Sequence, residues 1–179
     1  WHYWHAWLLL ALLFIPMICL GIGMLFFSPQ LLSKRLNNKE KERTQKHVVV
    51  FSGLMFLGGF ILCGLDHRFA WSQVPFWVVI TASMLFLIGY VIYAEVLREN
   101  AYLSRTVEVQ DNQQLIDTGL YSIVRHPMYT ATLLMFLSMP LILGSWWALA
   151  LFAIYPLLII KRIRNEEQVL ASGLEGYAD

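Results

Sequence analysis

The chain has 179 residues, of which 58% are hydrophobic, 15% aromatic and only 14% charged. Soluble domains are about 45–50% apolar and about 25% charged, so this balance indicates that lipid is the main solvent. The net charge of +1 and the lack of basic runs interleaved with aromatic residues argue against a nucleic-acid surface. Cys19 and Cys63 lie far apart within apolar runs, which predicts neither a disulfide framework nor a thiolate metal site.

Three apolar runs in the first half of the chain predict membrane-spanning helices. The segment Trp4–Phe27 is almost uncharged and, at 1.5 Å per residue, is long enough to cross a hydrocarbon core of about 30 Å. The segments His47–Leu65 and Phe76–Leu97 predict the second and third helices, and several glycines in the second permit close helix contacts. Between the first two helices, Lys34–Lys46 is rich in charge and predicts a solvated loop.

The hydrophobicity falls between Arg98 and Arg125 and then rises again. A polar connection of this length is unusual between helices and is typical of a functional segment or lid. Pro127 fits the first turn of a helix, where its missing N–H costs nothing, so we expect His126 at the N-cap. The start of such a helix offers N–H groups and a positive dipole to an anion.

The last third of the chain predicts a helical hairpin. Met128–Leu143 and Trp146–Ile160 carry no charge and are joined only by Gly144-Ser145. We expect prolines within both arms, Pro140 and Pro156, to be able to kink them. The hairpin brings the basic residues that follow it back beside Arg125 and His126; these residues are Lys161, Arg162 and Arg164.

Lysine and arginine counts predict the orientation. Lys34–Lys46 contains six, Arg98–Arg125 three and the tail after the hairpin three, whereas Arg68 stands alone after the second helix. By the positive-inside rule the first three regions lie in the cytoplasm and the N-terminus lies outside, which requires five crossings. The sequence thus predicts an all-α integral membrane bundle of about five transmembrane helices with a C-terminal hairpin and a cytoplasmic pocket.

Several chemistries do not suit the residues that gather on this face. His126, Glu166 and Glu167 lack a recognised ligand spacing, so we predict no metal site. No serine or cysteine lies in an elbow motif, which argues against nucleophilic hydrolysis. No Gly-rich phosphate loop is present, although membrane reductases can lack that motif.

Two motifs carry a resemblance to a known family. The run "GLYSIVRHPMYTA" at 119–131, followed by the hairpin and then "RIRNEEQVL" at 162–170, resembles the isoprenylcysteine carboxyl methyltransferase family of membrane enzymes. The resemblance covers about Thr106 to Tyr177, and the earlier helices match only in character. It implies methyl transfer from S-adenosyl-L-methionine to the C-terminal carboxylate of a prenylated cysteine, a lipophilic substrate that enters from the bilayer.

The same resemblance implies roles for individual residues. Arg162 and Glu166 are the expected catalytic pair, with Arg162 and Arg164 binding the substrate carboxylate and Glu166 holding the amino-acid end of the cofactor. The family pattern places the cofactor against Gln113, Gln114, Leu115, Ile116, Tyr121, His126, Pro127, Met128, Tyr129 and Glu166. Phenol rings and a carboxylate suit a cationic sulfonium. One position departs from the pattern, because Ala131 stands where the family usually has glycine, which puts a tight cofactor contact there in question.

Other interpretations remain open from the sequence. A similar terminal motif occurs in phospholipid amine methyltransferases, whose acceptor would need a base and gain less from Arg162. A sterol-type reductase that uses NADPH has a distantly similar terminal region, and a non-enzymatic membrane scaffold or lipid-binding protein would need no cofactor. We expect one integrated domain in which residues 1–97 form the N-terminal helices and 98–179 the catalytic region. The oligomeric state is not predicted.

Overall fold

The computed structural model describes residues 3–36, 43–103 and 115–173, and within these ranges every regular element is helical. This confirms the predicted all-α class. The elements in chain order are α1 (Trp4–Phe27), α2 (Pro29–Leu36), α3 (Arg43–Phe69), α4 (Phe76–Glu99), the 3₁₀ turn η1 (Gly119–Ser122), α5 (Pro127–Ile142), α6 (Trp146–Phe152) and α7 (Tyr155–Gly173).

Four helical stretches are long and apolar enough to cross a membrane: Trp4–Phe27, Gln45–Phe69, Phe76–Glu99 and Trp146–Ser172. Helix α5 is shorter, with 16 residues, or about 24 Å at 1.5 Å per residue. The predicted bundle of about five crossings is therefore confirmed as four to five candidate spans. Large apolar side chains on α1, α3 and α4 are exposed, for example Phe26, Leu57 and Trp77, as expected for surfaces that face lipid.

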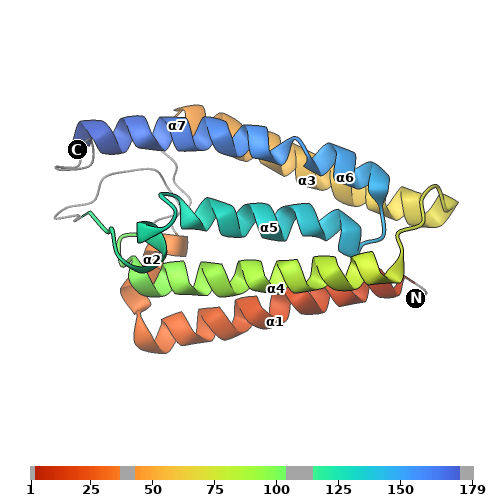
Figure 1. Ribbon diagram of the computed structural model, residues 1–179, viewed down its shortest axis with the longest axis horizontal. Helices are drawn as coiled ribbons and strands as arrows, with labels where there is room; N and C mark the ends of the chain where they lie inside the picture. Colours follow the sequence, from red (N-terminus) through yellow and green to blue (C-terminus); the bar gives the residue numbers. More distant parts are fainter. Residues whose placement is uncertain (1–2, 37–42, 104–114, 174–179) are drawn as a thin grey trace.

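Helix α5 lies at the centre of the bundle. It packs most extensively along α4 and also touches α1, α3, α6 and α7. In Figure 1 it runs between α4 and α1 on one side and the layer of α3, α6 and α7 on the other. A short helix surrounded by other helices exposes little surface to lipid, so its length need not match the bilayer.

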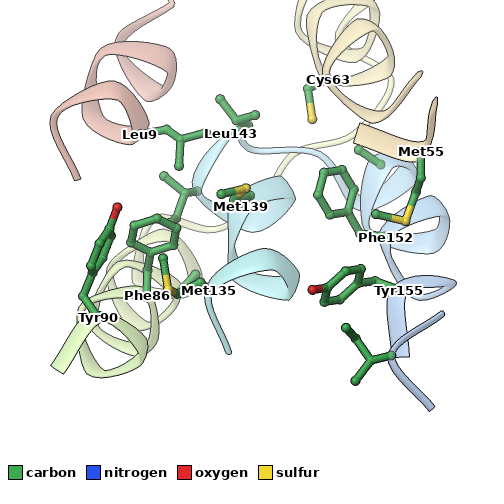
Figure 2. Close-up of a cluster of buried hydrophobic side chains, with 14 of the residues drawn as sticks. Leu9, Met55, Cys63, Phe86, Tyr90, Met135, Met139, Leu143, Phe152 and Tyr155 are labelled. Atoms are coloured by element: carbon green, nitrogen blue, oxygen red, sulfur yellow. The ribbon is translucent and has the colours of Figure 1, made fainter. Parts of the chain in front are cut away.

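The core forms where α5 meets its neighbours. Met135 and Met139 of α5 pack near Phe86 of α4 on one side, while Phe152 and Tyr155 lie on the other (Figure 2). Two glycines permit the closest contacts. A Cβ at Gly59 would lie 2.2 Å from the Phe152 ring, and a Cβ at Gly89 would lie 2.6 Å from Met135. Small residues at these positions let the helices pack closely.

Two boundaries differ from the prediction. Part of the predicted Lys34–Lys46 loop is helical, because α2 runs to Leu36 and α3 begins at Arg43; the residues between them lie outside the described ranges. The predicted Trp146–Ile160 arm is divided into α6 and α7 by a turn at 153–154. Pro156, the second residue of α7, cannot donate a hydrogen bond back to α6, which explains the break. Pro140, by contrast, lies inside an unbroken α5.

A buried carboxylate fastens the end of the bundle near the N-terminus. Asp66, 1% exposed, accepts hydrogen bonds from the Ser72 backbone N–H at 2.8 Å and from the hydroxyls of Ser72 and Ser145. Ser145 also caps α6 by accepting from the Ala148 N–H at 3.1 Å. The loop between α3 and α4 is thereby tied to the turn between α5 and α6, which fixes the hairpin at the end away from the predicted site.

Candidate functional site

The first turn of α5 forms one wall of the candidate site. His126 is the N-cap residue and Pro127 occupies the first turn, as predicted. The N–H groups of Tyr129 and Thr130 both bond to the His126 carbonyl, at 3.1 and 3.3 Å. Fewer N–H groups are therefore available to an anion than the sequence led us to expect, because these two already donate within the first turn of the helix. Among the described residues, the Met128 N–H is the donor in this turn that has no backbone partner.

Helix α7 supplies the opposite wall. Arg162 and Glu166 lie four residues apart and so share one face of the helix. The Tyr129 hydroxyl joins them, because it accepts a hydrogen bond from Arg162 Nε at 2.9 Å and donates one to Glu166 Oε2. The Arg162 guanidinium also lies 5.9 Å from the centre of the Tyr129 ring. Tyr129 is only 4% exposed, so this polar chain lies in a largely dry environment.

A second contact ties the two walls together beside the first. His126 Nε2 lies 3.2 Å from Glu167 Oε1. Arg125 Nη1 lies 3.9 Å from the same oxygen. The Arg125 pair is largely exposed and contributes little stability. The His126–Glu167 pair is better shielded, because the histidine side chain is only 14% exposed. Helix α7 thus returns to Arg125 and His126, and the contacts there come from Glu167, whereas the prediction named the basic residues Lys161, Arg162 and Arg164.

Tyr121 reaches the site from the η1 turn. Gly119 has a φ of +52°, and a Cβ there would lie 1.3 Å from Glu99 Oε1, so only glycine fits without rearrangement. The turn is held by a hydrogen bond of 3.0 Å from the Leu120 N–H to Glu99 Oε2. The Tyr121 hydroxyl accepts a hydrogen bond of 2.8 Å from Asn100 Nδ2. The end of α4 therefore positions Tyr121.

The electrostatic surroundings of Tyr121 connect it to the α5–α7 pair. Burial raises the pKa of the Tyr121 phenol, and the carboxylates of Glu166 and Glu99 raise it further, while the hydrogen bond from Asn100 opposes the rise. A raised pKa keeps this phenol protonated at physiological pH, so its O–H remains a hydrogen-bond donor. The Glu166 carboxylate, which accepts from Tyr129, thus also contributes to the electrostatic surroundings of Tyr121.

Sequence reasoning missed two groups that reach the site from other helices. Gln45 of α3, fully buried, donates from Nε2 to Asn165 Oδ1 at 2.7 Å and to the Arg162 carbonyl at 3.2 Å. Arg35 of α2 contacts the Tyr93 hydroxyl, and its Nη1 lies 3.9 Å from Met128 Sδ. Both belong to the segment predicted as a solvated loop, and a single glutamine in a charged stretch gives no local signal of burial.

The remaining predicted site residues lie as follows. Leu115 is exposed and Ile116 partly buried, while Gln113 and Gln114 lie outside the described ranges. Arg164 is exposed; two residues turn a helix by about 200°, so it points away from the face of Arg162 and Glu166. Ala131 is fully buried against α4, where its carbonyl would lie 3.0 Å from a Cβ at Gly89. A larger residue at 131 would disturb that helix contact.

Within the described ranges, no group of three or more His, Cys, Asp or Glu side chains could hold a metal ion. A cavity of about 490 Å³ opens between the α1–α2 junction and the end of α4. Its lining includes Ser28, Lys34, Arg98 and Tyr102, and none of the predicted site residues.

The residues that meet at α5 and α7 suit a cationic ligand. Glu166 accepts a hydrogen bond from the Tyr129 phenol, and Glu167 lies beside His126. Carboxylates and phenol rings both attract a sulfonium. The guanidinium of Arg162 provides, next to them, a fork that matches a carboxylate. The donor set therefore fits S-adenosylmethionine together with an acidic acceptor, whereas the nearly closed α5 start offers less to the cofactor carboxylate than predicted.

The fold and these residues define an integral membrane protein with an ionisable, partly dry site at one end of its helical bundle. The family model for phospholipid methyltransferases matches residues 77–175, more than half of the chain. The chain belongs to this family and is a membrane methyltransferase; enzymes of this class generally use S-adenosylmethionine. No curated protein and no solved structure shows a significant match. Membership favours methyl transfer over the reductase and scaffold alternatives, and the narrower isoprenylcysteine resemblance stays a prediction.

Proposed function

We propose that this protein transfers a methyl group from S-adenosylmethionine to the carboxylate of a lipophilic acceptor, of which a prenylated cysteine is the model. The observation that supports this most directly is the chain from Arg162 through Tyr129 to Glu166. In this chain Arg162, which would bind the anionic methyl acceptor, lies close to Glu166, which would bind the cationic methyl donor. The predicted roles of Arg162 and Glu166 are therefore geometrically compatible within one site.

The proposed reaction requires little acid–base chemistry. The bound cofactor would supply a methyl carbon attached to a positively charged sulfur. The acceptor carboxylate oxygen would form the new C–O bond as the S–C bond breaks, the electron pair would pass to sulfur, and no proton would move. Arg162 would orient the acceptor, and the buried setting of Tyr129 would limit water near both charges.

The expected location of the site follows from the charge distribution. The basic residues of α2, the end of α4 and α7 lie at the same end of the bundle (Figure 1), and we propose that this end faces the cytoplasm. The lipophilic part of the acceptor would reach the site laterally from the bilayer.

A second candidate acceptor is a phospholipid amine. The description of the matched family supports it, as does the His126–Glu167 pair with Nε2 and Oε1 3.2 Å apart. A protonated amine must lose a proton before it can attack a methyl group, and a histidine held by a carboxylate is a suitable base. In that reaction Arg162 would contact the lipid phosphate instead of a carboxylate.

Methyl incorporation from labelled S-adenosylmethionine distinguishes these acceptors. Purified protein in nanodiscs should methylate N-acetyl-S-farnesylcysteine and leave phosphatidylethanolamine unmodified. The reverse preference, together with loss of activity in His126→Ala, would establish the amine reaction. S-adenosylhomocysteine should raise the melting temperature with either acceptor class, because a ligand that binds only the folded state stabilises it. A protein that neither responds to it nor methylates either acceptor would refute the proposal.

A further inference from the structure

A polar side chain outside both motifs contacts the proposed catalytic helix. Gln45 near the start of α3 has 0% exposure, and its Nε2 donates to the Arg162 carbonyl at 3.2 Å and to Asn165 Oδ1 at 2.7 Å. Its own Oε1 has no hydrogen-bond partner among the described residues. Burying an unpaired carbonyl oxygen costs stability, so an apolar residue would serve packing better at this position.

The position of α7 depends on such contacts. The turn at 153–154 separates α7 from α6, so α6 does not continue into α7 and cannot alone fix its rotation. Helix α7 packs more extensively on α3 than on α5. Rotation or sliding of α7 on α3 would therefore move Arg162 relative to Tyr129, whose hydroxyl it meets at 2.9 Å.

One turn of α7 is held from two sides. Gln45 of α3 donates hydrogen bonds to the Arg162 carbonyl and to the Asn165 side chain. From the other side, the Tyr129 hydroxyl of α5 bonds to the side chains of Arg162 and Glu166. Catalysis that relies on alignment is sensitive to displacements of about 1 Å. Alignment of Arg162 would thus explain why a buried glutamine stands at position 45 although its Oε1 is unpaired.

We propose that Gln45 is a positioning residue that sets the register of α7 on α3 and thereby holds Arg162 in line with the methyl acceptor. This inference rests on the proposed function in so far as it concerns methyl transfer. Its structural part, the register of α7, is independent of that function. Gln45 acts through Arg162 and is not required to touch either substrate.

The main test compares Gln45→Met, which keeps the side-chain length but removes the donor, with Met55→Ala, which weakens the packing of a buried residue on the same helix. Gln45→Met should lower kcat with the farnesylcysteine acceptor by about 10- to 100-fold. Its affinity for S-adenosylhomocysteine should fall by less than kcat does, because a binding contact tolerates a small displacement of α7 better than the alignment of the reacting atoms does. Unchanged kcat, or an equal loss of cofactor affinity, would overturn the proposal.

A double-mutant cycle separates positioning from general destabilisation. In an Arg162→Lys background, whose fork is already lost, Gln45→Met should lower kcat less than about threefold, whereas Met55→Ala should have the same effect in both backgrounds. Fully additive effects of Gln45→Met and Arg162→Lys would show that Gln45 does not act through Arg162.

Hydrogen exchange supplies a readout that does not depend on activity. Gln45→Met should increase amide exchange across residues 161–167 of α7 and leave residues 131–142 of α5 unchanged. If the wild-type protein methylated neither acceptor, the proposed function would fail, yet this exchange pattern would still establish the register of α7. Unchanged exchange in α7 would refute the positioning role whatever the enzyme's substrate.

Discussion

Tyr129 links two side chains to which the sequence assigns different tasks. Its hydroxyl accepts from Arg162 and donates to Glu166, so a single buried atom sets the distance between the predicted acceptor and cofactor groups. Charge-assisted hydrogen bonds of this kind are about twice as strong as neutral ones. Loss of Arg162 would remove the donor to this hydroxyl, whereas loss of Glu166 would remove its acceptor. We therefore expect the two variants to change different measurable steps.

At this scale we predict a division of labour within α7. Glu166→Ala should weaken binding of S-adenosylhomocysteine by at least about tenfold, the equivalent of one lost charge-assisted contact of about 1.5–3 kcal/mol. Arg162→Ala should bind it within about threefold of wild type and lose methyl transfer by about 100-fold or more. Calorimetry and initial rates measure the two effects. The exposed neighbour Lys161→Ala serves as control. Equal loss of cofactor affinity in both variants would contradict the assigned roles.

Helix α5 owes its central position to a close contact with α4. Gly89 lies where a Cβ would be 2.6 Å from Met135 Cγ and 3.0 Å from the Ala131 carbonyl. The methionine can move, but the backbone oxygen cannot move without shifting the helix. Because Tyr129 is two residues before Ala131, a displacement of α5 would also disturb its contacts with α7.

The corresponding prediction concerns small residues on two helices. Gly89→Val should lower the free energy of unfolding by about 1–3 kcal/mol through overpacking of the α4–α5 contact. Gly64→Ala is the matched control, since a Cβ at Gly64 meets nothing within 4 Å and alanine favours helix. Thermal unfolding in the same detergent compares them. Equal melting temperatures for wild type and Gly89→Val would show that α4 and α5 do not need this close approach.

The molecule has a cluster of polar side chains at each end of its helical bundle. One holds the site formed by η1, α5 and α7, and the other holds Asp66 with the loop before α4 and the turn before α6 (Figure 1). The spans between them expose apolar side chains to lipid. The basic residues gather at the first end, which supports a cytoplasmic site.

Site-directed labelling tests this orientation. Gln73 is exposed in the loop between α3 and α4, and Ser172 is exposed near the end of α7. These two segments lie at opposite ends of the bundle (Figure 1). In a background with Cys19→Ala and Cys63→Ala, Gln73→Cys should react with an impermeant maleimide on intact cells, and Ser172→Cys should react only after permeabilisation. The cysteine-free parent gives the background. Labelling of Ser172→Cys on intact cells would place the site outside and remove the basis for a cytoplasmic acceptor.

The apolar runs determined most of the architecture. A chain that is 58% hydrophobic must satisfy its backbone hydrogen bonds internally in lipid, so long uncharged runs become helices and Trp4–Phe27 matches α1 residue for residue. The His126-Pro127 pair was sufficient to predict the start of α5 because proline restricts its own backbone. The "RIRNEEQVL" motif marked the part of α7 that returns to that start.

Only the tertiary structure decided which side chains meet there. The sequence placed Arg162 and Arg164 together, yet helical rotation turns Arg164 toward the exposed face while Arg162 reaches Tyr129. Gln45 and Arg35 join the site from a segment whose local pattern indicates a solvated loop. Such contacts depend on how helices rotate and pack against one another. Packing depends on close contacts such as the one between Gly89 of α4 and Met135 of α5, two residues that are more than 40 positions apart in the sequence.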